Sequence, residues 1–167
     1  TGALECGVYY MKEIECRNGY LLDTEVYELS IVPDQIVILK LNNKRIPISI
    51  EVMKIDYDNQ SFTPQGDAIL EGAVYGLYAK ENVEHINTAK VVYKKDSLVC
   101  KIVIDKYGKG RVNNLYPGKY YIKELIPPIG YTMDDSVYDI DCTIYDSSLN
   151  VLKKEVIVSD VSKKQAF

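Results

Sequence analysis

The sequence predicts an all-β protein, a β-sandwich built from tandem modules. Apolar and polar residues alternate along short stretches, and no stretch shows a convincing amphipathic helix. Clusters of turn-forming residues separate these stretches. The chain also has 15 tyrosines, 2 phenylalanines and no tryptophan. Tyrosine at this level favours strands that have one half-exposed face.

The alternating stretches give the expected strands in chain order. They are 8–14, 25–31, 35–42, 47–56, 73–79, 90–94, 98–105, 119–125, 136–145 and 154–161. Between them lie turn-like stretches such as DYDNQSFTPQGD, DKYGKGRVNN, ELIPPIGYT and YDSSLN. Many short strands with regular turns are typical of a sandwich. Residues 80–97 are polar and charged, and we expect a hairpin arm or a short helix there.

An internal repeat defines the modules. GVYYMKEIECRNGYLLDTEVYEL at 7–29 recurs as GKYYIKELIPPIGYTMDDSVYDI at 118–140, an offset of 118 − 7 = 111 positions. This spacing indicates tandem domains. We expect residues 1–46 to be the C-terminal part of a first module and residues 47–167 to be a complete one. An incomplete module exposes apolar surface and strand edges, so it should dock on the second module, another chain or a missing piece.

Composition excludes several classes of function. The net charge of −4 argues against a nucleic-acid surface, and no apolar run is long enough to cross a bilayer. The cysteines lack metal-ligand spacing, and the single histidine, His85, has no identifiable nucleophile partner. We therefore expect no metal, no cofactor and no enzymatic turnover. Cys100 and Cys142 are expected to be buried free thiols or, alternatively, one disulfide.

Three charged residues lie in phase with apolar stripes on expected strands. They are Lys54, Glu124 and Asp160. Each ends a stripe of two apolar residues: Ile50 and Val52, Tyr120 and Ile122, and Val156 and Val158. The three could lie where their strands meet solvent and form a partly exposed salt bridge. If they are buried together instead, the cost of burying charge requires a reason.

The second copy of the repeat resembles the E-box of B-type repeats from Gram-positive pilins and collagen-binding surface adhesins. The usual form is G-x-Y-x-x-x-E-x-x-x-P-x-G-Y, carried here by Gly118, Tyr120, Glu124, Pro128, Gly130 and Tyr131. Upstream, L-x-G-A-x-[FY]-x-L is carried by Leu70, Gly72, Ala73, Tyr75 and Leu77. The resemblance covers residues 48–163 and, through the first copy, most of 4–46.

This resemblance implies a prealbumin-like, immunoglobulin-like Greek-key sandwich with an internal isopeptide bond. The bond would join Lys54 to Asp160, with Glu124 promoting the reaction. Burial favours the neutral amine, which is the nucleophile, and the fold supplies effective concentration. Water would leave from the aspartate. Such a reaction turns over once, so it is autocatalysis and not enzymatic function.

The first module has degenerate counterparts of these residues. Glu13 matches the glutamate, and Asn43 matches the acceptor, with Asn42 as second choice. Cys16 and Arg17 replace the two prolines. The lysine-bearing strand would precede the sequence, so we expect no isopeptide bond within this segment. A lysine that reaches it would have to come from elsewhere.

The resemblance implies a structural, force-bearing stalk or shaft module of a bacterial adhesin or pilin, outside the cell and attached to the cell wall. Its partners would be neighbouring modules of the same surface protein, or another chain that completes residues 1–46. The alternative is an adhesin module that binds a host protein or glycan, for which residues 80–97 are the natural surface. No particular host ligand is specified by the sequence.

Overall fold

The computed structural model describes residues 4–146 and 148–163, which fall into two compact units. The smaller unit comprises Thr1–Ile46 and Tyr145–Asn150, and the larger comprises Pro47–Ile144 and Val151–Phe167. Among the described residues, all regular secondary structure is β and none is helical. The all-β prediction is therefore confirmed. No helix in this part of the chain could cross a membrane.

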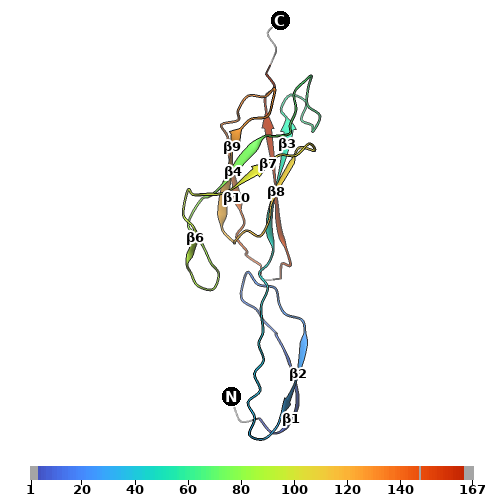
Figure 1. Ribbon diagram of the computed structural model, residues 1–167, viewed down its shortest axis with the longest axis vertical. Helices are drawn as coiled ribbons and strands as arrows, with labels where there is room; N and C mark the ends of the chain where they lie inside the picture. The colour runs from blue at the N-terminus through green and yellow to red at the C-terminus, as the bar shows by residue number, and fades with distance from the viewer. Residues whose placement is uncertain (1–3, 147, 164–167) are drawn as a thin grey trace. The chain divides into compact units, whose positions relative to one another are not determined.

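The larger unit is a sandwich of two sheets (Figure 1). One sheet has the order β10-β9-β4-β7 and the other β11-β3-β8, while β5 and β6 form a separate hairpin. The strands are β3 (Ile48–Asp56), β4 (Val74–Ala79), β5 (Val83–Glu84), β6 (Val91–Tyr93), β7 (Leu98–Val103), β8 (Lys109–Val112), β9 (Lys119–Ile126), β10 (Val137–Asp141) and β11 (Leu152–Asp160). The core contains Ile50, Val52, Tyr75, Leu77, Tyr120 and Ile122, all buried.

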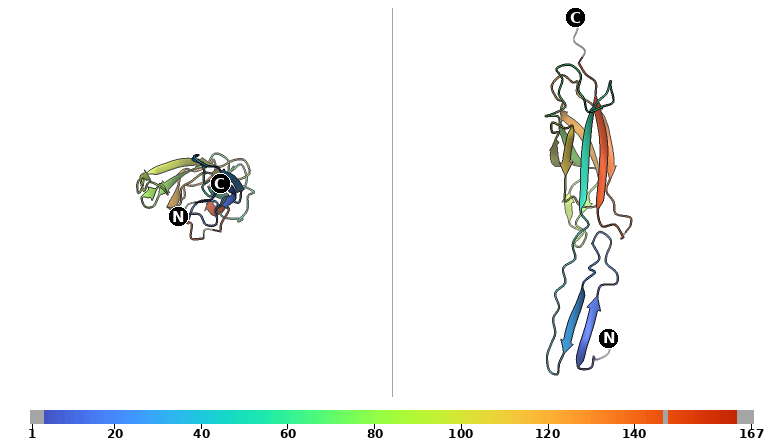
Figure 2. Two further views of the ribbon diagram at one scale, coloured as in Figure 1. Left: turned by 90° about the horizontal axis from the view of Figure 1, so that it is seen from below. Right: turned by 90° about the vertical axis from the view of Figure 1, so that its right-hand side faces the viewer.

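The first and last strands of this unit, β3 and β11, are direct neighbours. They pair in parallel from Leu152 opposite Ile48 to Asp160 opposite Asp56, and Figure 2 shows them side by side. Every second residue of β3 is buried, Lys54 and Asp56 included. Because β3 lies between β11 and β8, both of its edges are hydrogen-bonded.

The smaller unit contains one antiparallel pair, β1 (Gly7–Lys12) and β2 (Val26–Ile31). The expected strand at 35–42 is wrong, because no regular β-structure is found there. Its counterpart in the larger unit, β11, has β3 as its only sheet neighbour among the described residues. Residues 35–42 have no sheet neighbour within the described part of the smaller unit, so their alternating pattern does not form a strand there.

One further element differs from expectation. Strand β8 lies within DKYGKGRVNN, which we expected to be a turn. A Cβ on Gly110 would lie 2.6 Å from Cγ2 of Ile102 and 2.9 Å from the carbonyl oxygen of Val103. Because it has no side chain, Gly110 lets β8 pass close to β7 of the opposite sheet. The composition of this segment resembles a turn and does not reveal the strand. Of the two alternatives expected for residues 80–97, the hairpin is correct, because β5 and β6 pair there.

The cysteines are free thiols. Cys142 is buried and Cys100 is half-buried. Cys100 lies on β7 and Cys142 directly follows β10, and these strands are at opposite edges of the four-stranded sheet. The alternative of a Cys100–Cys142 disulfide is therefore wrong.

Candidate cross-linking site

Lys54, Glu124 and Asp160 meet in the core of the larger unit. The Nζ atom of Lys54 lies 3.0 Å from Oε1 of Glu124 and 2.6 Å from Oδ1 of Asp160. All three side chains have an exposed fraction of 0%. The alternative of a partly exposed salt bridge at solvated strand ends is therefore wrong, while the inward phase expected for each residue is correct.

Strand register explains this meeting. Lys54 is opposite Val158 in the parallel β3–β11 pair, so Asp160 is its diagonal neighbour on the same face. Glu124 comes from the other sheet, where β9 pairs with β4 and Glu124 is opposite Tyr75. The site thus spans the sandwich, with the lysine and aspartate on one sheet and the glutamate on the other.

Tyr75 is a member of this site that the sequence reasoning treated only as a motif aromatic. Its hydroxyl accepts a hydrogen bond of 2.8 Å from Nζ of Lys54, and the lysine lies 5.2 Å from the ring centroid. Burial raises the pKa of Tyr75, so the phenol stays neutral. A tyrosine on the buried, otherwise apolar face of a strand needs a hydrogen-bond partner for its hydroxyl. This requirement is the feature of the sequence that could have pointed to Tyr75.

A second contact fixes Glu124 on its strand. The backbone N–H of Asp134 donates to Oε2 of Glu124 at 2.9 Å. Asp134 in turn accepts from the hydroxyl of Tyr138 at 2.6 Å and from the backbone N–H of Ser136 at 2.9 Å. One oxygen of Glu124 is thereby held by the backbone, while the other faces the lysine.

Asp160 is poorly satisfied for a buried carboxyl group. Its Oδ1 forms an ion pair of 2.6 Å with Nζ of Lys54, and among the described residues neither of its oxygens makes a further hydrogen bond of regular geometry. Burial raises the pKa of Asp160 to about 7, the charge of Lys54 opposes this rise, and Glu124 adds to it. A carboxyl group whose pKa is raised toward neutral pH, held beside a buried amine, is an arrangement in which an amide bond can form.

Comparison with known families identifies the domain to which this part of the chain belongs. A profile of the SpaA family, described as a prealbumin-like fold domain, matches residues 49–155. The chain belongs to this family. The matched range of the SpaA domain includes Lys54 and Glu124, whereas Asp160 lies beyond its end. No curated protein gives a match.

Solved structures also resemble this chain. The Bacillus anthracis TIE protein is 26% identical, with a TM-score of 0.68 over 95% of this chain and 26% of that protein. The group B streptococcus pilus 2b backbone protein is 19% identical, with a TM-score of 0.47 over 84% of this chain and 45% of that protein. The T6 backbone pilin of Streptococcus pyogenes is 26% identical, with a TM-score of 0.44 over 61% of this chain and 17% of that protein. The chain spans less than half of each.

Tyr131, the last residue of the motif that resembles an E-box, anchors one end of the SpaA domain. Tyr131 donates from its hydroxyl to Oδ2 of Asp56 at 2.7 Å, and both residues are buried. Asp56 also accepts from Gln65 and from two backbone N–H groups of the turn after β3. Hydrogen bonds to the carboxylate lower the pKa of Asp56 although its burial acts in the opposite direction. Asp56 is thus a satisfied structural anchor, unlike Asp160.

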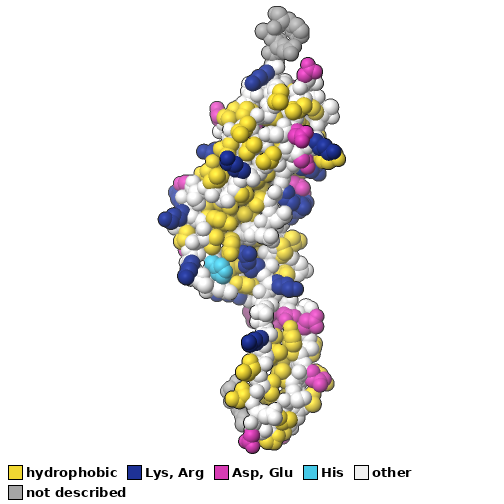
Figure 3. All heavy atoms as spheres, viewed as in Figure 1, with side chains coloured by type: hydrophobic (Ala, Val, Ile, Leu, Met, Phe, Trp, Pro, Cys, Tyr) yellow, Lys and Arg dark blue, Asp and Glu magenta, His cyan; other side chains and the backbone are white. Residues whose placement is uncertain are grey.

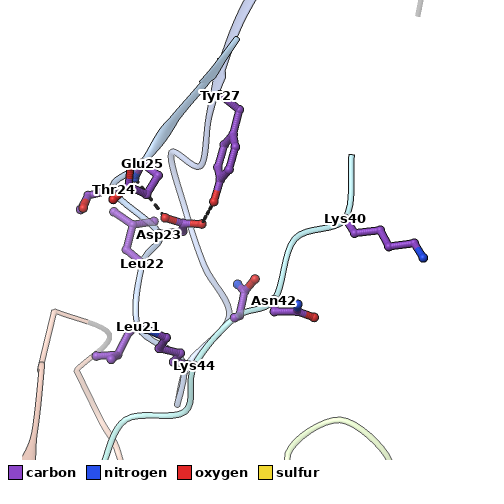
Figure 4. Close-up of a pocket in the computed structure, with 10 residues that line it drawn as sticks. Leu21, Leu22, Asp23, Thr24, Glu25, Tyr27, Lys40, Asn42 and Lys44 are labelled. Carbon is purple, nitrogen blue, oxygen red and sulfur yellow. Dashed lines mark hydrogen bonds between the residues drawn. The ribbon is translucent and has the colours of Figure 1, made fainter. Parts of the chain in front are cut away.

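The smaller unit repeats part of the SpaA-domain site. Nδ2 of Asn43 donates to Oε1 of Glu13 at 2.8 Å, so the expected acceptor counterpart lies beside the glutamate. Asn42 lines a neighbouring hollow, shown in Figure 4. In this unit Asn43 is exposed, and no lysine in the described part of the chain forms an ion pair with Glu13 within 4.0 Å. No group of His, Cys, Asp or Glu in the described residues could hold a metal ion.

Proposed function

We propose that this chain is a structural, load-bearing module of a Gram-positive surface adhesin or pilus, strengthened by an autocatalytic Lys54–Asp160 isopeptide bond. The observation that carries the proposal is the buried cluster in which Nζ of Lys54 lies 2.6 Å from Asp160 and 3.0 Å from Glu124. Membership of the SpaA family and the E-box resemblance support it. The module would work outside the cell, on its wall, joined to neighbouring modules.

The chemistry begins from a neutral amine and a protonated acid. Nζ of Lys54 attacks Cγ of Asp160, the Nζ–Cγ bond forms, and one Cγ–O bond breaks. One proton moves from Nζ to the departing hydroxyl, which leaves as water, and Glu124 carries that proton. Tyr75 positions Nζ through its hydroxyl. The reaction consumes the side chains of Lys54 and Asp160, so it occurs once per chain and is not enzymatic turnover.

The bond would join the first and last strands of the larger unit. It closes a loop of 160 − 54 = 106 residues. In the chain-entropy model for cross-links, a loop of about this size removes unfolded-state entropy equivalent to roughly 4–5 kcal/mol. A link between β3 and β11 also gives tension a covalent route that bypasses the strands between them.

The test is the intact mass of the denatured, reduced chain. We expect the wild type to be lighter than its sequence by one water molecule, and Glu124→Ala and Lys54→Ala to have full mass. Glu155→Ala, an exposed glutamate on β11, is the matched control and should still lose water. A wild type at full mass would overturn the proposed bond.

Binding of a host protein or glycan remains the alternative prediction. The β5–β6 hairpin and its flanking loops offer exposed polar side chains. They show no arrangement that selects one ligand, so the structural role is the better supported of the two.

A further inference from the structure

A hollow lies on the outer face of the four-stranded sheet, which is the face turned away from the core of the larger unit. Its volume is about 480 Å³. The side chains that line it include lysines, aspartates and one tyrosine, namely Lys80, Lys95, Lys123, Asp96, Asp139 and Tyr121. The β5–β6 hairpin by itself selects no ligand, but residues that flank it complete this hollow against the sheet.

Strand pairing places the sheet residues of the hollow next to one another. Tyr121 and Lys123 alternate along β9 with buried residues that include Glu124, so they point out of the sandwich. Tyr121 is opposite Asp139 on β10 and opposite Tyr78 on β4. The sheet therefore brings an aromatic ring, a carboxylate and an ammonium group to one outer surface.

The flanking residues are held against this surface by hydrogen bonds. The backbone N–H of Lys80 donates to the carbonyl oxygen of Lys119 at 2.9 Å, and the backbone N–H of Asp96 donates to the carbonyl oxygen of Ala79 at 2.7 Å. The hydroxyl of Tyr121 donates to Oδ1 of Asp96 at 3.3 Å. The wall of the hollow is thus anchored to the sheet, as expected of a binding site that is formed before its ligand arrives.

Tyr121 gives the hollow an aromatic side of fixed orientation. Its ring stacks on that of Tyr78, with centroids 5.2 Å apart and an interplanar angle of 9°. Tyr78 can adopt this position because it lies against Gly76, where a Cβ would be 2.5 Å from Cε2 of Tyr78. Tyr78 does not line the hollow, so Tyr121 presents to it the part of the ring that Tyr78 leaves uncovered.

The lysines around this ring differ in their contacts. Lys80 forms an ion pair with Asp139. Among the described residues, neither Lys95 nor Lys123 has a carboxylate oxygen within 4.0 Å, although Lys123 lies 4.9 Å from the ring centroid of Tyr78. Figure 3 shows lysine and arginine side chains among exposed hydrophobic ones on the visible face of the larger unit. The uncompensated ammonium groups favour a ligand that carries an acid group.

We propose that this hollow binds an acidic saccharide, in which a sugar ring carries a carboxylate. The apolar C–H face of the sugar packs against the ring of Tyr121. The carboxylate meets Lys95 and Lys123, and sugar hydroxyls donate to Asp139. This inference goes beyond the load-bearing role and does not depend on the proposed isopeptide bond.

The lining of the hollow favours a saccharide over other anionic ligands. An apolar peptide segment would find one aliphatic side chain, Val137, among the described residues that line it. A small inorganic anion would leave Tyr121 unused and would approach the carboxylates of Asp96 and Asp139 without a hydroxyl to donate to them. A saccharide acid supplies the apolar face, the negative charge and the donors together.

The experiment is an NMR titration of the isotope-labelled full chain with two probes, a hyaluronan hexasaccharide and sialyllactose. Both carry a carboxylate on a sugar ring, as glucuronate in the first and as sialate in the second, so the probe that binds identifies the source of the ligand. We expect saturable shifts of the amide signals of Lys95, Tyr121, Lys123 and Asp139. Added salt should weaken the binding because it screens exposed charges.

Two substitutions test the residues that carry the proposal. Tyr121→Ala should weaken binding about tenfold, and the double variant Lys95→Met with Lys123→Met should weaken it by roughly fivefold or more. The double variant keeps the tyrosine, so it tests the hollow even if Tyr121→Ala does not fold. Lys106 lies 5.0 Å from the ring centroid of the exposed Tyr107, an equivalent pair outside the hollow. Lys106→Met and Tyr107→Ala are therefore matched controls and should bind as wild type.

Two further ligands separate the ring from the charge. Chitohexaose has sugar rings without carboxylates, and a polyglutamate peptide has carboxylates without sugar rings, so each should bind more weakly than the saccharide acid. Equal binding of either one would overturn the proposal, and equal binding of polyglutamate would indicate a surface for acidic peptides instead. Absence of binding by both acidic probes, or shifts confined to residues outside the hollow, would also overturn it. The Lys54–Asp160 bond is read from the intact mass of the same sample, so the two proposals can fail separately.

Discussion

Asp160 and Asn43, its expected counterpart in the smaller unit, differ in what they can release. We expect Asp160→Asn to form the same cross-link, because the amide carbon is also open to attack and Glu124 and Lys54 are unchanged. Intact mass should then fall short of the variant sequence by one ammonia instead of one water. Asp160→Ala, which has no carboxyl carbon at this position, should keep its full mass. A full-mass Asp160→Asn would show that the acid itself is needed.

Asp160 should also impose a pH dependence on stability when no bond is formed. Burial raises its folded-state pKa to about 7, above the value of about 3.9 expected in the unfolded chain. The unfolded state therefore holds fewer protons between these values, and stability should fall as pH rises from about 4 to about 7, by at most roughly 1.4 kcal/mol per pH unit. Above about pH 7 this contribution is constant.

Urea unfolding of Glu124→Ala, which we expect to remain uncross-linked, measures this dependence. The control is Glu124→Ala with Asp160→Asn, because it lacks the titrating acid and keeps the other charges. The difference between the two variants should follow the stated slope. Parallel curves across this pH range would contradict a raised pKa for Asp160.

At the scale of elements, the turn after β9 depends on a glycine. Gly130 has φ of 87°, and an added Cβ would lie 2.7 Å from Cβ of Ala68. We expect Gly130→Ala to lower the free energy of unfolding by roughly 2–4 kcal/mol, from left-handed strain and the close contact together. Chemical denaturation measures this loss.

Gly66→Ala is the matched control for that substitution. Gly66 also has a positive φ, of 57°, but a Cβ there would meet nothing within 4 Å. Its replacement should cost only the backbone strain, roughly 1–2 kcal/mol. Equal losses for the two variants would mean that the contact with Ala68 relaxes freely.

The elements also show how far sequence alone can reach. Alternation placed Lys54, Glu124 and Asp160 inward correctly, because the side-chain period of a strand is fixed by its backbone. The same alternation at 35–42 was misleading, because a strand also requires a partner and pattern cannot show whether one is present. Strand β8 was missed because its glycine and charged residues resemble a turn. Tyr75 was missed because its hydroxyl acquires a role only when β4 faces β3 across the core.

At the scale of the larger unit, the proposed bond determines how tension passes. Strands β3 and β11 are parallel neighbours, so a force that enters at residue 47 and leaves after Asp160 pulls along both. Without a bond, hydrogen bonds and packing between these strands carry the load, and their failure unravels β4 to β10. With the bond, tension crosses from Lys54 to Asp160 and the intervening strands are spared.

Single-molecule stretching of the chain between two marker domains tests this directly. We expect Glu124→Ala to release the chain between the linked positions, 160 − 54 = 106 Cα-to-Cα steps, an extension of about 380 Å at roughly 3.6 Å per step. The wild type should show no release of that length, since the covalent link cannot yield at forces that unfold ordinary domains. Glu155→Ala should behave as wild type. If wild type and Glu124→Ala extend equally, the cluster is an ion pair that breaks under load, and the module resists force only through its sheets.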